Sequence, residues 1–312
     1  MTSIYILAER LAADTNDKFK AAMLNSGVEG ATIRLTYGDI VKADGSLDFS
    51  QIAQYRALMP NTARMHLLMP PVTGPAAPAY KTVTLSTVGP FGNIGDVAYP
   101  CVWDPAFASL TERIMDRLAA YLDDNGWLDL LDGFRVANSV TYPDDGQWGF
   151  RSSSSGKRFD TEWQAAGYTP QAVLSAMSDY GALMAKTFPG SFFTFAPYSP
   201  EHSAVRVGDE GQILEKPDKG AFDLEVASTL AAAITPDAHG CLLASMQTTL
   251  EAGPPSTFVL KSAAITGGLA FQLNTSDASV PMATVASWIA NARSLDAERL
   301  ELHVNQAAAL TA

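Results

Sequence analysis

The sequence predicts an α/β fold, a (β/α)8 TIM barrel with enlarged loops at its C-terminal face, formed by a single domain over residues 1–312. Two observations lead to this prediction. Short apolar stretches alternate with stretches of helical spacing, which is typical of βαβ units and a parallel sheet. Eight such units fit a chain of 312 residues when the loops are long. An open doubly wound sheet is the alternative, but no Gly-x-Gly-x-x-Gly motif follows the first stretch, which disfavours a dinucleotide-binding fold.

The expected barrel strands are short apolar runs, several of which end in polar residues or proline. We expect them at residues 3–8, 31–37, 64–69, 134–137, 191–196, 240–246, 268–274 and 299–305. The segment 70–104 is long and rich in Pro, Gly and Thr, and an extra strand is expected within it at 82–87. A surface hairpin is expected within 205–218.

Helices are expected where apolar residues recur at spacings of three and four. Asp104 and Pro105 mark the clearest start, as N-cap and first helical residue. Gly27 is expected to end the first helix, and Asp48 or Ser50 to lie near the cap of the second. The expected helical ranges are 16–26, 49–55, 105–122, 170–186, 224–233, 257–265 and 283–294.

The composition excludes several classes of partner. The 21 Lys and Arg against 33 Asp and Glu give a net charge of −12, which repels nucleic acid and anionic membrane surfaces. No apolar run reaches the length of about 18 residues that a membrane span needs, and the first residues do not match a signal peptide. We expect synthesis in the cytoplasm, while a virion or cell-surface location stays open.

Neither the cysteines nor the histidines predict a metal site. Cys101 and Cys241 lie far apart and fit no metal-ligand spacing, so buried free thiols are the favoured interpretation and a disulfide stays open. The four histidines show no ligand spacing. No metal and no cofactor are therefore expected.

Three segments resemble the glycoside hydrolase superfamily of (β/α)8 barrels, in the clan with paired catalytic carboxylates. The run from Ile33 to Ile40 and the turn that follows it resemble strand two of that clan, with Tyr37 where the family often has Trp. Trp103-Asp104-Pro105-Ala-Phe107 is similar to the segment that opens the helix before strand four. Phe134-Arg-Val-Ala-Asn138 is similar to the end of strand four.

The chain departs from this family at both catalytic positions. The resemblance implies Asn-Glu at the end of strand four, where this chain has Asn138-Ser139, and a Glu at the end of strand seven, where it has Gln272-Leu273-Asn274. Glycoside hydrolysis needs one group that protonates the leaving oxygen and another that attacks or activates water. Gln does not titrate, and Ser without a base is a poor acid. Either the carboxylates come from elsewhere or the site only binds.

Other carboxylates near expected strand ends are candidates for relocated catalytic groups. Glu9 follows strand one, Asp39 follows strand two, and Asp144 follows strand four. Asp145 and Glu201 are further candidates. An ion pair with Arg10 or Arg34 is the alternative role for Glu9, a cap or turn role for Asp39, and a turn after Pro143 for Asp144.

Aromatic and amide side chains near strand ends favour carbohydrate binding. Aromatic rings offer flat apolar faces to sugar rings, and amides both donate to and accept from hydroxyl groups. The candidate binding residues are Arg34, Tyr37, Asn138, Tyr142, Trp148, Tyr198, Gln247, Gln272 and Asn274, with Phe150 and Asn305 nearby in this pattern.

The expected function is recognition of a carbohydrate or polysaccharide by a barrel that has lost the standard acid/base pair, within a surface or virion assembly with protein partners. An active glycosidase with relocated carboxylates is one alternative. A structural barrel whose C-terminal face packs against a partner is the other.

Overall fold

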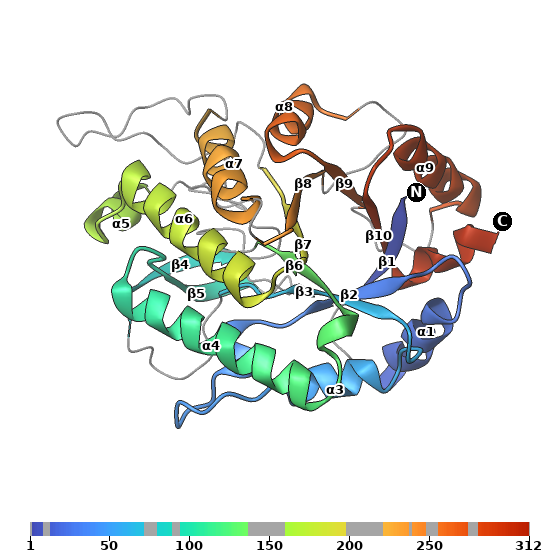
Figure 1. Ribbon diagram of the computed structural model, residues 1–312, viewed down its shortest axis with the longest axis horizontal. Helices are drawn as coiled ribbons and strands as arrows, with labels where there is room; N and C mark the ends of the chain where they lie inside the picture. The colour runs from blue at the N-terminus through green and yellow to red at the C-terminus, as the bar shows by residue number, and fades with distance from the viewer. Residues whose placement is uncertain are drawn as a thin grey trace.

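The computed structural model describes residues 2–8, 13–71, 80–88, 94–136, 160–197, 221–236, 239–247, 255–273 and 280–311. Parallel strands close into a barrel in the order β1-β2-β3-β6-β7-β8-β9-β10, which returns to β1 (Figure 1). The predicted (β/α)8 barrel is confirmed. Its strands are β1 (Ser3–Ala8), β2 (Gly30–Arg34), β3 (Arg64–Leu68), β6 (Leu131–Arg135), β7 (Phe192–Phe195), β8 (Leu242–Gln247), β9 (Leu269–Gln272) and β10 (Arg299–His303).

All eight barrel strands lie where the apolar runs predicted them, but several boundaries differ. β6 begins at Leu131, three residues before the expected start, because the polar pair Asp132-Gly133 belongs to the strand. β2 ends at Arg34 because the next residues turn into a short helix. The extra strand is confirmed as β4 (Thr82–Val88), which pairs with β5 (Ile94–Pro100) in an antiparallel hairpin outside the barrel. The hairpin expected within 205–218 lies outside the described residues.

Helices cover the outside of the barrel (Figure 1). They are α1 (Ala13–Met23), α2 (Tyr37–Ile40), α3 (Ser50–Arg56), α4 (Pro105–Asp124), α5 (Asp160–Ala165), α6 (Pro170–Thr187), α7 (Ala221–Ile234), α8 (Thr257–Thr266) and α9 (Met282–Ser294), with 3-10 turns η1 (Leu128–Leu130) and η2 (Val304–Thr311). Asp104 caps α4 as predicted, with its carboxylate 2.8 Å from the amide nitrogen of Ala106. The expected C-cap at Gly27 is wrong, because α1 already ends at Met23.

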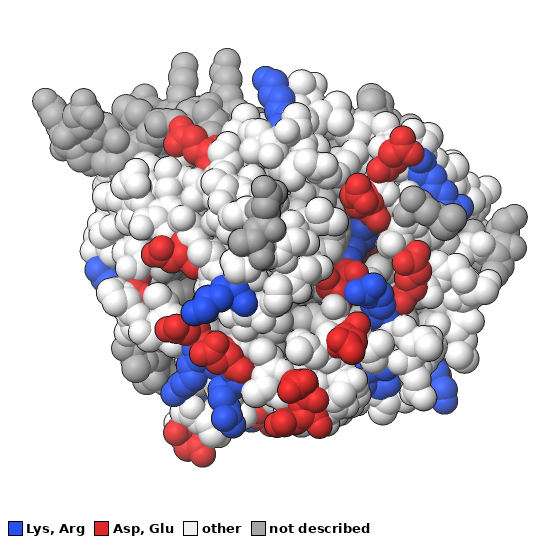
Figure 2. All heavy atoms as spheres, viewed as in Figure 1, with Lys and Arg blue, Asp and Glu red and all other residues white. Residues whose placement is uncertain are grey.

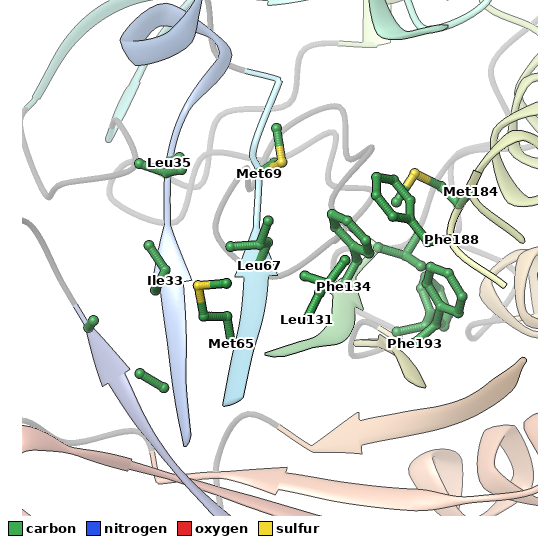
Figure 3. Close-up of a cluster of buried hydrophobic side chains, with 14 of the residues drawn as sticks. Ile33, Leu35, Met65, Leu67, Met69, Leu131, Phe134, Met184, Phe188 and Phe193 are labelled. Carbon is green, nitrogen blue, oxygen red and sulfur yellow. The ribbon is translucent and has the colours of Figure 1, made fainter. Parts of the chain in front are cut away.

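The hydrophobic core lies between the strands and the surrounding helices. Figure 3 shows side chains from β2, β3, β6 and β7 that point away from the barrel axis, Phe134 among them. Phe134 packs on Phe188 and Phe193 with ring centroids 4.5 and 6.1 Å apart. Burying one such ring contributes about 1.5–3 kcal/mol, so this shell stabilises the barrel and leaves its interior free for polar groups. Both cysteines are buried free thiols.

A bulge in β6 decides which of its side chains face the barrel interior. Opposite β3, Met65 pairs with Leu131 and His66 with Gly133, so Asp132 is an extra residue in the ladder. Such a bulge shifts the two-residue alternation of a strand by one position. Leu131 and Phe134 consequently pack in the outer core, while Asp132 and Arg135, three residues apart, make polar contacts inside the barrel.

Candidate functional site

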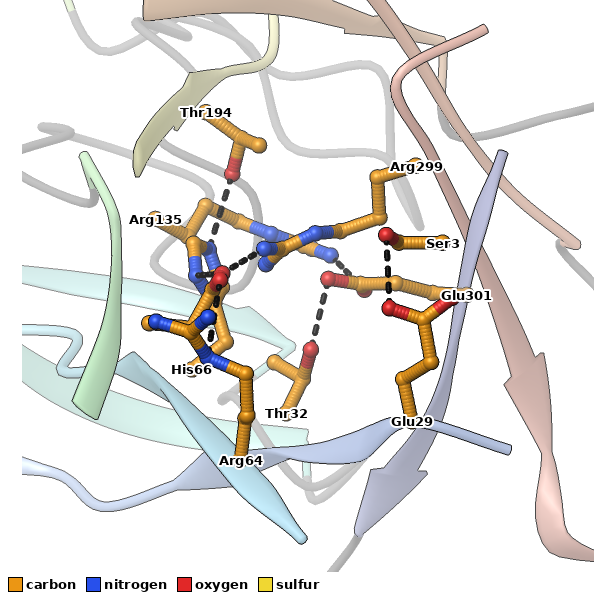
Figure 4. Close-up of polar contacts among 10 residues, drawn as sticks. Ser3, Glu29, Thr32, Arg64, His66, Arg135, Thr194, Arg299 and Glu301 are labelled. Carbon is orange, nitrogen blue, oxygen red and sulfur yellow. Dashed lines mark hydrogen bonds and ion pairs between the residues drawn. The ribbon is translucent and has the colours of Figure 1, made fainter. Parts of the chain in front are cut away.

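Four side chains form a polar layer inside the barrel toward its C-terminal end. This layer, called here the upper layer, comprises Thr32, Arg135, Gln272 and Glu301. Nη1 of Arg135 donates to Oε1 of Gln272 at 2.7 Å, and Nη2 donates to one carboxylate oxygen of Glu301. The Thr32 hydroxyl donates to the other oxygen of Glu301 at 2.6 Å (Figure 4). Because β6 is not a neighbour of β9 or β10, these contacts cross the barrel interior.

Burial decides what the upper layer can do chemically. Arg135 is 1% exposed and Glu301 is fully buried, so each charge needs the other as its counter-ion. Both carboxylate oxygens of Glu301 accept hydrogen bonds. In this arrangement Glu301 neutralises Arg135 and holds it in place against Gln272.

A second polar layer lies toward the N-terminal end of the barrel. This lower layer centres on Asp132, whose carboxylate pairs with Arg299 and lies 3.5 Å from Nε of Arg64. The Arg299 guanidinium is sandwiched between two rings, 4.0 Å from the centroid of Tyr5 and 4.7 Å from that of Phe192. Cation–π contact and the Asp132 pair together stabilise a guanidinium that is 2% exposed.

His66 lies next to Asp132 of the lower layer and contacts Thr194 on β7. Its Nε2 lies 3.2 Å from the Thr194 hydroxyl, and its Nδ1 lies 3.7 Å from Asp132. Complete burial, with added repulsion from the Arg299 and Arg135 guanidinium groups, holds the pKa of His66 well below its usual value. The imidazole is therefore neutral at neutral pH, and it separates two regions of positive charge without adding a third.

Two predicted site residues have structural roles outside the barrel interior. Tyr37 is 1% exposed, its ring stacks on Phe107, and burial raises the pKa of its phenol well above the usual value. Contrary to expectation, Tyr37 therefore presents no exposed ring face to a sugar. Asp39 forms a capping box with Thr36 at the start of α2 and accepts from its amide nitrogen at 2.9 Å. This is the cap role that was the alternative to catalysis for Asp39.

Four further predicted residues end strands or follow them. Gln272 lies in the upper layer, and Arg34 is the half-buried last residue of β2. Oε1 of Gln247, at the end of β8, accepts from the amide nitrogen of Ser256 at 3.0 Å. Asn305 is exposed in η2. The remaining candidates lie outside the described residues: Glu9, Asn138, Tyr142, Asp144, Asp145, Trp148, Phe150, Tyr198, Glu201 and Asn274.

The sequence interpretation missed the charged interior of the barrel. Arg299, Glu301 and His303 alternate with Leu300 and Leu302 along β10, and all five residues are buried. Polar residues at every second position of a buried strand place one polar face toward the barrel axis. This alternation was the available signal, and it identifies Glu301 as a barrel residue.

Two features are absent from the described residues. No group of three or more His, Cys, Asp or Glu side chains there could hold a metal ion. Within the same residues, no helix combines the length and the apolar character needed to cross a membrane.

Several solved structures with similar folds are named as enzymes that act on carbohydrates. A β-galactosidase from the psychrophilic Marinomonas ef1 superimposes with a TM-score of 0.55 at 9% identity, over 99% of this chain and 59% of that chain. A β-galactosidase from the Antarctic haloarchaeon Halorubrum lacusprofundi gives 0.53 at 12% identity, over 96% and 52%. Endo-glycoceramidase II from Rhodococcus sp. gives 0.50 at 9% identity, over 97% and 73%.

These similarities establish the fold. The chain spans 52–59% of the length of the two β-galactosidases, and identities of 9–12% carry no information on substrate. No protein-family profile matches the chain, and no curated sequence matches it significantly.

Proposed function

We propose that this (β/α)8 barrel, whose fold is that of glycoside hydrolases, binds a carbohydrate at its C-terminal face without cleaving it. The single observation that carries the proposal is the contact between Arg135 and Gln272. By the sequence resemblance, the end of β9 is where hydrolases of this clan have their nucleophilic carboxylate. Here an amide occupies that strand end and is bound by a buried guanidinium.

This contact fixes which group Gln272 offers to a ligand. Arg135 can only donate, so the Gln272 oxygen must face it, and the NH2 group must point elsewhere. No described residue accepts a hydrogen bond from that NH2 group. Gln272 therefore offers a donor, which suits a sugar hydroxyl or ring oxygen, whereas a catalytic nucleophile at this place must offer an electron pair.

Asn138, Tyr142 and Trp148 follow the sequence of β6, Tyr198 follows that of β7 and Asn274 that of β9, and they are proposed as further ligand-binding residues. Their side chains combine aromatic faces with amide and hydroxyl groups, the two kinds of surface that sugars contact. We also propose a role in a virion or cell-surface assembly. Such a role suits binding without cleavage, because a protein that adheres through a glycan must not degrade that glycan.

The test compares wild type with Gln272→Ala on an array of polysaccharide-derived oligosaccharides. Loss of one hydrogen bond should weaken glycan binding by roughly fivefold to tenfold. The matched variant Gln51→Ala, in α3 on the outside of the barrel, should bind as wild type does. If no glycan binds the wild type, the structural-barrel alternative replaces the proposal.

If the protein is instead an active glycosidase, a different result is expected with the same oligosaccharides. It requires relocated carboxylates, so Glu9→Gln or Asp144→Asn should abolish release of reducing ends while binding persists. Asp39→Asn should not, because that carboxylate caps α2.

A further inference from the structure

A groove lies outside the barrel between α4 and α6, far from the polar layers of its interior. The two helices run side by side in Figure 1, and the groove between them has a volume of about 560 Å³. That volume lies within the usual range for small-molecule sites, roughly 300–1,000 Å³. The lining residues are Val102, Trp103, Pro105, Phe107, Ala108, Ser109, Thr111, Glu112, Ala172, Ser175, Ala176, Asp179, Tyr180 and Leu183.

The groove exists because short side chains occupy the facing helix stripes. Ala108 and Ser109 on α4 face Ala172, Ser175 and Ala176 on α6 across the groove. On α6 these residues fall three and four positions apart, and on α4 Ala108 and Ser109 fall three and four positions after the lining residue Pro105, so each set shares one helix face. Alanine and serine side chains are too short to fill the space between the helices, so the groove results from the small residues at these positions.

A buried phenol without a partner lies at the floor of the groove. Tyr180 is 7% exposed, and its hydroxyl has no hydrogen-bond partner among the described residues. Burial also raises the pKa of Tyr180 well above its usual value, so the phenol stays neutral and can both donate and accept. The neighbouring Thr111 hydroxyl is already within 3.4 Å of the Tyr37 hydroxyl.

The rim of the groove is acidic and its walls are apolar. Glu112 on α4 and Asp179 on α6 are exposed carboxylates, and no Lys or Arg is among the lining residues. Figure 2 shows acidic and basic side chains interspersed over the described part of the face on which α4 and α6 lie. Phe107, Trp103 and Leu183 supply the apolar wall.

We propose that this groove binds a small amphipathic cation, an aromatic ring joined by a short chain to an ammonium group. The ring would lie against Trp103, which is only partly buried, and the ammonium between Glu112 and Asp179. Tyr180 would accept a hydrogen bond from the ammonium. This proposal is independent of glycan binding at the C-terminal face.

The test uses phenethylamine as the probe, titrated into the whole chain and followed by NMR or calorimetry. Its uncharged analogue 2-phenylethanol and its anionic analogue 3-phenylpropionate measure the contribution of charge. Phenethylamine should bind more tightly than both. Glu112→Gln and Asp179→Asn should each weaken its binding by about threefold, and Tyr180→Phe by about fivefold.

Two further variants separate site occupancy from general charge. Ala176→Leu fills the groove and should abolish saturable binding of phenethylamine while the chain stays folded by circular dichroism. Asp116→Asn, on α4 but not among the lining residues, should leave the affinity unchanged. Equal affinity for the three probes, absence of binding, or unchanged binding in Ala176→Leu would each overturn the proposal.

Discussion

At the scale of single residues, the charges inside the barrel are held by few partners. Arg135 has its oxygen partners on Gln272 and Glu301, and removing one partner of a buried ion pair costs about 3–5 kcal/mol. Replacement of Glu301 by an uncharged residue would therefore destabilise the fold, and any change in glycan binding could not be separated from that loss of stability. Gln272 is the better probe, because its loss leaves the Arg135–Glu301 pair in place.

His66 makes the stability of the fold depend on pH. Its folded-state pKa is lowered by burial, while in the unfolded chain it is about 6.5. The stabilisation is fully present above pH 6.5 and is lost as the pH falls from there toward the lowered pKa, because only the unfolded chain takes up the proton. Between pH 7.5 and 5.5, urea unfolding should show about 1.4 kcal/mol more loss in wild type than in His66→Gln.

The control for this measurement is Thr194→Val, which removes the hydroxyl near Nε2 of His66 but keeps the imidazole. It should lower the free energy of unfolding at both pH values and keep the wild-type pH dependence. If the free energy of unfolding depends equally on pH in wild type and in His66→Gln, His66 titrates alike in the folded and the unfolded chain. That result would contradict a lowered pKa for His66 in the folded barrel.

At the scale of the element, the bulge in β6 directs Asp132 and Arg135 into the barrel interior. Gly133 allows the bulged strand to lie close to the backbone of β7. A Cβ atom at Gly133 would lie 1.8 Å from the carbonyl oxygen of Phe192, a distance that the neighbouring strand cannot accept. Gly133→Ala should therefore lower the free energy of unfolding by about 3 kcal/mol or more, or prevent folding, as measured by denaturant titration.

The matched variant is Gly126→Ala, at a φ of 69° with nothing within 4 Å of the added Cβ. It should cost only the strain of a left-handed alanine, about 1–2 kcal/mol. Similar losses for the two variants would mean that close contact with β7 does not define the bulge.

The elements also show what the sequence could predict. Strands such as β1, which matches its expected range, and the Asp104-Pro105 start of α4 follow from local patterns. The early start of β6 does not, because Asp132-Gly133 resembles a turn and becomes a strand only through pairing with β3 and β7. The burial of Tyr37 could not be predicted from local sequence either. Its position after a strand suggested a ligand-binding ring, but in the structure the ring packs on Phe107.

At the scale of the whole molecule, barrel closure creates a site that no local pattern contains. Arg135 and Glu301 lie 166 residues apart in the chain and meet only because β6 and β10 lie across the same barrel. The fold class was predictable from the alternation of strands and helices. The contact of Gln272 with Arg135 was not, because Arg135 comes from a strand that is distant in sequence and the contact depends on the register of both strands.

We propose that the C-terminal end of this barrel holds a glycan without cleaving it. Mass spectrometry of a bound oligosaccharide tests this most directly. A glycan selected on the array is incubated with wild-type protein, recovered from the complex, and weighed against the starting material. If the barrel retains the glycan intact, we expect recovery at the original mass with no new reducing ends after prolonged incubation. Shorter products that appear with wild type and vanish with Glu9→Gln or Asp144→Asn would contradict it and establish an active glycosidase.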